Sequence, residues 1–115
     1  MSEGPKIFTF EEARRLLPQV REHTQASIER IGAAHAEIEI AEDEEDGGEH
    51  AFEKTAAEIL GEWAGKVRAL GIEVKGPWLI DFDSGSGYFC WKWPEESLEF
   101  FHGYDEGFSG RVRIQ

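Results

Sequence analysis

The last third of the chain, from residue 78 to residue 111, holds most of the side chains that could do chemistry. Ten of the fourteen aromatic residues lie there, together with the only cysteine, Cys90. A compact polar set accompanies them: Asp81, Asp83, His102, Asp105, Glu106 and Arg111. We therefore expect any specific chemistry to lie in this segment.

His102 is the centre of the candidate metal or acid/base site. Asp81 or Asp105 could orient its ring, which would make it a metal ligand or a general base. Asp81 and Asp83 lie two residues apart on a predicted strand, so their side chains share a face and could bind a divalent cation or transfer protons. The candidate metal ligands are Asp81, His102 and Asp105. The interpretation that we favour is structural: a histidine that orders the tail through a carboxylate, and a solvated pair of acids.

Arg111 follows the turn G-F-S-G and is a candidate ligand-binding residue. Its guanidinium could hold a carboxylate or a phosphate through two parallel hydrogen bonds. The interpretation that we favour is a structural salt bridge to Asp81, Asp105 or Glu106. The segment is not a phosphate loop, because no glycine-lysine pair precedes a helix.

Cys90 and Trp91 occupy the middle of a predicted strand. A thiol in buried, apolar surroundings is inert, which is the expected state of Cys90, unless His102 on the neighbouring strand pairs with it. Trp91 is expected to be mainly a core residue. It is also a candidate for stacking a ring ligand.

The first seventy residues, which must position this segment, follow a helical pattern. Thr9-Phe10-Glu11-Glu12 is a capping box that starts a helix. Apolar residues recur in steps of three and four from Ala13 to Ile38. Pro18 lies inside the pattern and predicts either a bend or a short first helix that ends near Leu17.

A second helix is predicted from about Glu49 to Leu70. The glycine pair Gly47-Gly48 is expected to turn the chain before it, and Gly71 to end it with a left-handed residue. Two striped helices with a short turn form an antiparallel hairpin, here over about residues 9–70.

The apolar period changes to two after residue 71, which indicates a sheet. Strands are predicted at residues 72–75, 78–82, 88–93 and 98–102, with tight turns that imply antiparallel pairing. The tail, 103–115, is expected to be an ordered loop with a short terminal strand. The fold class is α+β: a single domain, 1–115, with a long helical hairpin followed by a three- to four-stranded meander over about 72–115.

The predicted hairpin is longer than so small a sheet can cover. The first helix would span about 45 Å at 1.5 Å per residue. Part of its apolar stripe needs a further partner, and a second copy of the chain would supply one. We expect a homodimer in which two hairpins form a four-helix bundle.

The charge of the chain limits its partners. The net charge is −12, from 24 acidic and 12 basic residues. Nucleic acid and anionic membrane surfaces would both repel the protein, so neither is an expected partner. No apolar run approaches the roughly 20 residues of a membrane span, and the first residues lack the apolar core of a signal peptide. A single cysteine fits a reducing compartment, so we expect a cytoplasmic protein.

Common catalytic and cofactor signatures are missing from the sequence. There is no G-x-S-x-G, G-x-G-x-x-G or C-x-x-C, and His23, His35 and His50 show neither H-E-x-x-H nor E-x-x-H. Helix-borne zinc and di-iron sites are therefore disfavoured.

The two ends of the chain resemble one family. They read F-T-F-E-E-A-R-R-L-L-P-Q-V and C-W-K-W-P-E-E-S-L-E-F-F-H-G-Y-D-E-G-F-S-G-R. The sequence is similar to the prokaryotic domain-of-unknown-function 2203 family over about residues 7–113. The family's V-D-F-like strand falls on residues 80–82, its C-W strand on 90–91, its aromatic-His pair on 101–102 and its G-F-x-G-R on 107–111.

Two departures accompany the resemblance. The turn between Phe82 and Tyr88 is shorter and Ser/Gly-rich, and Gly103 stands where an acidic residue commonly follows the histidine. The His–x–x–acid spacing falls on His102 and Asp105. The resemblance implies a fold and a set of positions, and it implies no activity.

Two functions from different classes fit these observations. The first, which we prefer, is a non-catalytic dimeric protein that binds a protein or small molecule with the aromatic, mixed-charge surface around His102 and Arg111. The second is a small enzyme, dependent on a divalent metal or on acid/base chemistry, with His102 and nearby carboxylates as ligands or bases. The enzyme requires a concave pocket where His102 and a carboxylate converge.

Overall fold

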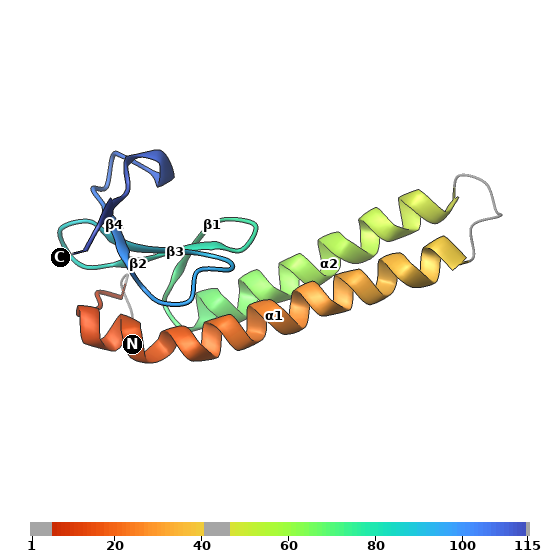
Figure 1. The fold of residues 1–115 in the computed structure, drawn as a ribbon, viewed down its shortest axis with the longest axis horizontal. Coiled ribbons are helices and arrows are strands. Elements are labelled where there is room, and N and C mark those ends of the chain that lie inside the picture. The colour runs from red at the N-terminus through yellow and green to blue at the C-terminus, as the bar shows by residue number, and fades with distance from the viewer. Residues whose placement is uncertain (1–5, 41–46, 115) are drawn as a thin grey trace.

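A computed structural model describes residues 6–40 and 47–114 as a helical hairpin joined to a small antiparallel sheet (Figure 1). The α+β fold class is confirmed. The elements in chain order are α1 (Phe10–Ile40), α2 (Gly47–Ala69), β1 (Glu73–Gly76), β2 (Leu79–Asp83), β3 (Tyr88–Lys92), β4 (Phe100–His102), the 3₁₀ helix η1 (Phe108–Gly110) and β5 (Val112–Arg113).

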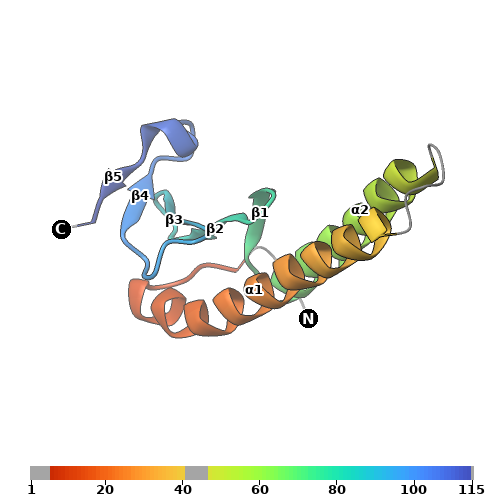
Figure 2. The same cartoon turned by 45° about the vertical axis from the view of Figure 1, so that its right-hand side comes forward.

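α1 starts at the predicted capping box. The backbone N–H of Thr9 donates to Glu12 Oε1 at 3.0 Å, and the N–H of Glu12 donates to Thr9 Oγ1 at 3.0 Å. Pro18 lies inside a helix that continues to Ile40, so the alternative of a short first helix ending near Leu17 is wrong. Figure 2 shows α1 curving over its first turns, which a proline without a backbone N–H explains.

α2 runs antiparallel to α1 and begins two residues earlier than predicted. The glycine pair therefore starts the helix, and the connecting turn falls on residues outside the described part of the chain. Gly71 follows the helix with φ of 89°, and its N–H donates to the carbonyl of Arg68 at 2.9 Å, as expected of a left-handed cap.

The sheet has five strands in the order β1-β2-β3-β4-β5, and all neighbours are antiparallel. It has more strands than the three or four predicted because the terminal segment joins its edge, with Phe101 opposite Val112. The fourth strand is shorter than predicted, since Leu98 leaves the ladder and is buried in the core.

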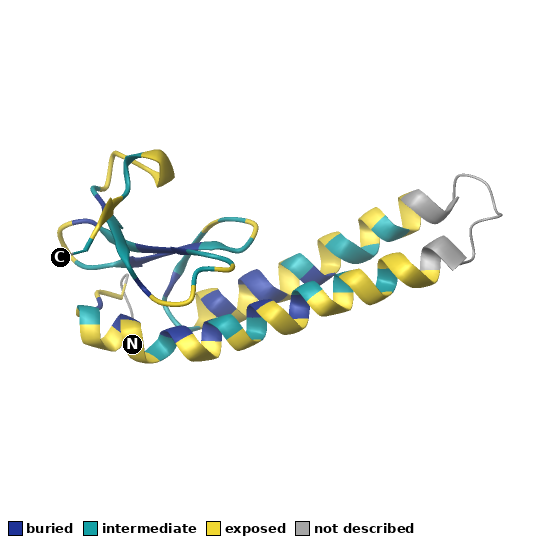
Figure 3. Cartoon of the chain, viewed as in Figure 1, coloured by how far each residue is buried: buried dark blue, intermediate teal, exposed yellow. Residues whose placement is uncertain are grey.

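One face of the sheet packs on the helices. Ile80 and Phe82 of β2 and Trp91 of β3 are all fully buried on this inner face. They meet Phe8 and helix residues from Ala13 to Val67 in one core cluster, and Figure 3 shows buried residues concentrated where sheet and hairpin meet. Strand alternation therefore sends the neighbouring residues, Asp81 and Cys90, to the opposite, outer face.

The hairpin extends beyond the sheet and gives the molecule an elongated shape (Figure 1). The radius of gyration is 16.7 Å, whereas a compact domain of this size has about 13 Å. Among the described residues, no helix combines the length and the apolar character that a membrane crossing requires.

Candidate functional site

Three functional groups meet on the outer face of the sheet because of strand register. Asp81 of β2 lies directly opposite Cys90 of β3, and His102 of β4 lies opposite Tyr88, two residues from Cys90. Antiparallel neighbours and their diagonals lie close enough for side chains to touch. Asp81, Cys90 and His102 are all buried, with 2%, 0% and 3% of their surfaces exposed.

Both ring nitrogens of His102 have partners. Nδ1 lies 2.8 Å from the carbonyl oxygen of Gly103, and Nε2 lies 3.0 Å from Asp81 Oδ2. A carbonyl oxygen only accepts, so Nδ1 carries a proton. The second hydrogen bond needs another proton, held by Nε2 or by Oδ2. The pair therefore shares one proton and is neutral overall.

The second oxygen of Asp81 has no partner. Oδ1 is buried and makes no hydrogen bond to the described residues. A buried polar group without a hydrogen-bond partner lowers the stability of the fold by about 1–3 kcal/mol, and a charged group lowers it by more. Such groups are therefore rare in folded proteins. This atom makes the outer face a candidate functional site.

Cys90 lies beside this carboxylate. Burial, followed by the negative charge of Asp81, raises the pKa of the thiol to about 12, against the opposing effect of Arg111. The thiol is therefore protonated near neutral pH. A Cys90–His102 catalytic pair does not form, because Asp81 occupies the ring nitrogen that would activate the thiol.

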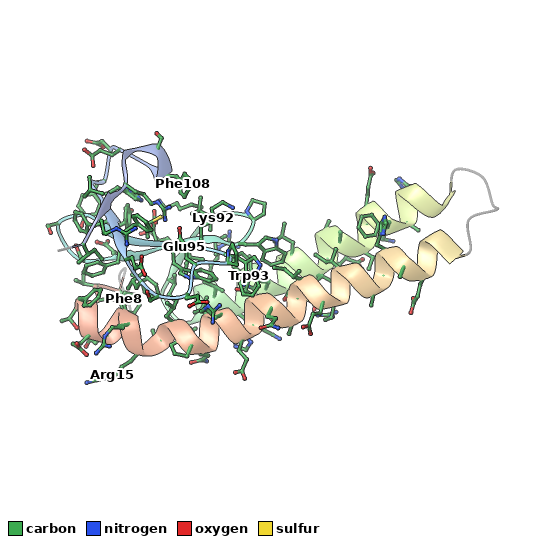
Figure 4. All side chains as sticks on the ribbon, in the orientation of Figure 1. Phe8, Arg15, Lys92, Trp93, Glu95 and Phe108 are labelled. Atoms are coloured by element: carbon green, nitrogen blue, oxygen red, sulfur yellow. The ribbon has the colours of Figure 1, made fainter. Side chains whose placement is uncertain are left out.

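The three groups form the floor of a pocket of about 310 Å³, which we call the outer-face pocket. Its walls are Lys75, Leu79, Tyr88, Tyr104, Gly107 and Phe108. The segment from residue 103 to residue 111, here called the strap, passes over this face and ends in η1. Figure 1 shows it on the side of the sheet away from the helices, and in Figure 4 Phe108 lies on that side whereas Phe8 lies between sheet and α1.

Arg111 fastens the strap to the sheet. Its Nη1 and Nη2 donate to Glu95 Oε1 and Oε2 at 3.1 and 2.8 Å. Its guanidinium lies 3.9 Å from the ring centroid of Phe100 and 4.2 Å from that of Phe108. The predicted structural salt bridge is present, but the predicted partners Asp81, Asp105 and Glu106 are wrong. Glu95 is the partner because it lies in the turn after β3, where Lys92 N–H also fixes its carboxylate.

Tyrosine hydroxyls brace the pocket walls. Tyr88 donates to Glu73 Oε1 at 3.0 Å, and burial together with this bond raises its pKa. Tyr104 donates to Asp83 Oδ1 at 2.7 Å, and this bond raises its pKa. Asp83 also accepts from the N–H of Gly85, so it orders the β2–β3 turn and the strap and does not pair with Asp81.

The structure brings together some of the candidate site residues and separates others. Asp81 and His102 meet as expected from alternation. Asp105 is exposed and has no hydrogen bond or ion pair among the described residues, and it lies outside the pocket lining. Trp91 is on the inner face, fully buried, with its indole N–H donating to the carbonyl of Glu95 at 2.8 Å.

The predicted metal set omits Cys90, which the structure places beside Asp81 and His102. Donor atoms of these three residues all lie within 4.8 Å of one another. Alternation along the strand predicted that Cys90 and Tyr88 share a face. The sequence did not show which residue of β2 lies opposite Cys90, so Cys90 was not included in the predicted metal set.

A larger groove of about 480 Å³ lies between α2 and β1. It is lined mainly by apolar residues, including Ala57, Leu60 and Trp63. Its charged side chains, Arg68 and Lys75, are exposed. The described lining holds no buried unpartnered polar atom, so the smaller outer-face pocket is the better candidate site.

The match to known proteins agrees with the resemblance at the ends of the sequence. No curated protein matches the chain, and no solved structure matches it. The model of the family described as "Uncharacterized conserved protein (DUF2203)" matches residues 6–114. Because this match covers nearly all of the 115 residues, the chain belongs to that uncharacterised family.

Proposed function

We propose that this protein is a ligand-binding protein whose ligand occupies the outer-face pocket. The observation that carries the proposal is Asp81 Oδ1, a buried carboxylate oxygen without a partner at the floor of a pocket. A pocket with mostly apolar walls and a few convergent polar groups is the usual form of a small-molecule site.

The pocket limits the chemistry of its occupant. Its volume of about 310 Å³ is at the small end of the range for ligand pockets. The occupant must present a cation or a hydrogen-bond donor to Asp81 Oδ1, since that oxygen can only accept when Asp81 is ionised. Leu79 and Phe108 favour an apolar body against the walls.

Arg111 contributes to this function by closing the strap. Its Nη1 and Nη2 both donate to Glu95, and its guanidinium lies over the rings of Phe100 and Phe108. It therefore holds the pocket roof in place, and the ligand contacts fall to Asp81, His102 and the walls.

An acid/base enzyme is the second candidate, and one observation favours it. His102 and a carboxylate converge in a pocket, which that function requires. In the usual arrangement, however, the carboxylate bonds Nδ1 and leaves Nε2 to act as the base. Here Nε2 is hydrogen-bonded to the carboxylate, so His102 could not accept a proton from a substrate directly. Asp81 would have to accept that proton.

A fragment screen by saturation-transfer NMR tests the binding proposal. Leu79→Trp fills the outer-face pocket, and Ala57→Trp fills the groove between α2 and β1 as the matched control. We expect fragments that carry an amine, amide N–H or hydroxyl to bind the unaltered protein and the Ala57→Trp variant. The Leu79→Trp variant should lose this binding. Loss of signal in the Ala57→Trp variant alone would place binding in the groove and would contradict the proposal.

We further propose that the protein is a homodimer through the distal part of the hairpin. Ile28, Ile31 and Phe52 are only half-buried there, where the sheet offers no cover. Light scattering behind size exclusion should give twice the mass of 13.0 kDa, and Ile31→Glu should return it to one chain. A single-chain mass across the accessible concentration range would end this proposal.

A further inference from the structure

We propose that Asp81, Cys90 and His102 bind one thiophilic divalent metal ion, with zinc as the best fit. The ligands are the Asp81 carboxylate, the Cys90 sulfur and His102 Nε2, and the remaining coordination position faces the outer-face pocket. This inference rests on the proposed function, because it names the chemistry of the occupant of that same pocket.

The set of donor atoms selects the class of metal. One sulfur, one imidazole nitrogen and one carboxylate oxygen suit zinc, which prefers nitrogen and sulfur ligands in a tetrahedral arrangement. Calcium takes six to eight oxygen ligands and magnesium keeps an octahedral oxygen shell, and this floor offers neither. Three protein ligands beside a pocket match the form of zinc sites that keep an open position.

The geometry is close to that of a bound state. The three donors lie within 4.8 Å of one another. In a tetrahedral zinc site, bonds of about 2.0–2.3 Å place the donors roughly 3.3–3.7 Å apart. The approach needed is about an ångström, within reach of small side-chain rotations.

His102 is already oriented for metal binding. Its Nδ1–H donates to the carbonyl of Gly103, which leaves Nε2 directed at Asp81 on the floor. Metal-binding histidines commonly donate the other ring N–H to a carbonyl or carboxylate, because this fixes the ring and its tautomer.

The charge of the floor balances with a divalent ion. Without metal, the hydrogen bonds of His102 make the Asp81–His102 pair neutral, and Cys90 is a buried free thiol. Binding M²⁺ would release two protons, the shared one and the thiol proton, and leave a carboxylate and a thiolate. The site stays neutral, and the nearby charge of Arg111 is already balanced by Glu95.

A cobalt and zinc titration of untagged, metal-free protein tests the inference. Tetrahedral Co²⁺ with a thiolate ligand gives a sulfur-to-metal charge-transfer band in the near ultraviolet, so the band reports Cys90 directly. We expect the band to saturate at one Co²⁺ per chain and to disappear when one Zn²⁺ displaces the cobalt. Competition with a chromophoric chelator then gives the zinc affinity.

Variants separate binding at this floor from binding elsewhere. Asp81→Asn and His102→Gln should each weaken zinc binding by about 100-fold or more, since even residues behind the ligands matter by 10- to 100-fold. Asp105→Asn and His23→Gln are the matched controls and should bind as the unaltered protein does. Substitutions of buried residues can prevent folding, so circular dichroism is used to check that each variant is folded. The result is decided by the unaltered protein and the two control variants.

The outcomes for the metal and for the pocket are distinguishable. One tight zinc with the cobalt–thiolate band supports the metal site. No stoichiometric metal, or a band that Asp105→Asn abolishes, overturns it. If zinc fails while fragments still bind as tested above, only the metal inference falls. If neither zinc nor fragments bind, the proposed function falls with it.

Discussion

The two faces of the sheet are made by the same strands but bury different kinds of side chain. On the inner face, Ile80, Phe82 and Trp91 are completely buried against the hairpin. On the outer face, Asp81, Cys90 and His102 are almost as deeply buried, yet they are polar or reactive. Among the described residues, every buried side-chain nitrogen or oxygen of the inner face has a hydrogen-bond partner, whereas Asp81 Oδ1 on the outer face has none.

This difference shows which face stabilises the fold and which face carries a group that lowers its stability. A core needs apolar volume and close packing, and the inner face has both. A buried carboxylate with an unmatched oxygen destabilises the fold, and such groups collect at functional sites. The strap adds a cover that the inner face does not need, because the helices already exclude water there.

The largest loss of stability should come from removing a buried side chain on the inner face. Phe82→Ala removes a fully buried ring that packs edge-on against Phe8, with centroids 5.3 Å apart. We expect a loss of about 3–5 kcal/mol in the free energy of unfolding, measured by urea denaturation. The same change at the half-buried Phe100 on the outer face should cost clearly less, and an equal loss would remove the distinction between the faces.

Releasing the strap should have the next largest effect. Arg111→Ala breaks a twofold hydrogen-bonded pair whose arginine is only 13% exposed. Breaking such a pair should cost about 2–3 kcal/mol, less than for a fully buried one. A double-mutant cycle with Glu95→Ala should show strong coupling, and amide exchange over residues 103–111 should accelerate. Additive losses would mean that the pair does not hold the strap.

A polar contact within the hairpin core gives a third, smaller test. The Trp63 indole N–H donates to Thr24 Oγ1 at 2.8 Å, and the Thr24 hydroxyl donates to the carbonyl of Val20 at 2.7 Å. Thr24→Val keeps the shape but leaves the indole N–H unpaired, so we expect a loss of about 1–3 kcal/mol by thermal and urea unfolding. Thr24→Ser keeps the hydroxyl and should cost less. An unchanged stability in Thr24→Val would show that unpaired groups are tolerated here, which would weaken the argument from Asp81.

The reactivity of Cys90 tests the outer face without changing stability. Raising the pKa of a thiol from 9.0 to about 12 lowers the thiolate fraction about 1000-fold near pH 8. Metal-free native protein should therefore react with iodoacetamide at least ~1000-fold more slowly than unfolded protein, and the rate should rise with pH toward 12. Rapid labelling of the native protein at pH 8 would contradict the buried, carboxylate-flanked setting.

The helices and the face of each strand residue could be predicted from sequence because both depend on local pattern. The reciprocal bonds of Thr9 and Glu12 are a local device, so the start of α1 follows from four residues. Alternation likewise put Asp81 on one face of β2 and Tyr88 and Cys90 on one face of β3. Pro18 could not be decided locally, since packing along the hairpin carries α1 past it.

Which residues meet at the site could not be fully predicted from sequence, because it depends on strand register and turn geometry. Neither of these follows from a local sequence pattern. Cys90 joins Asp81 because these two positions are paired across β2 and β3. Arg111 reaches Glu95 because the turn after β3 returns that carboxylate toward the strap. Spacing alone suggested Asp105, three residues after His102, but the strap carries that residue to the surface.

A residue-resolved ¹H–¹⁵N NMR map would show directly whether ligands bind the outer face. Uniformly labelled protein would be titrated with zinc and, separately, with the strongest fragments from the screen. We expect the perturbed amides to surround Asp81, Cys90, His102 and Phe108, with the inner face and the distal hairpin unchanged. Perturbations centred on Ala57, Leu60 and Trp63, or none on the outer face, would contradict the claim that this face is the functional one.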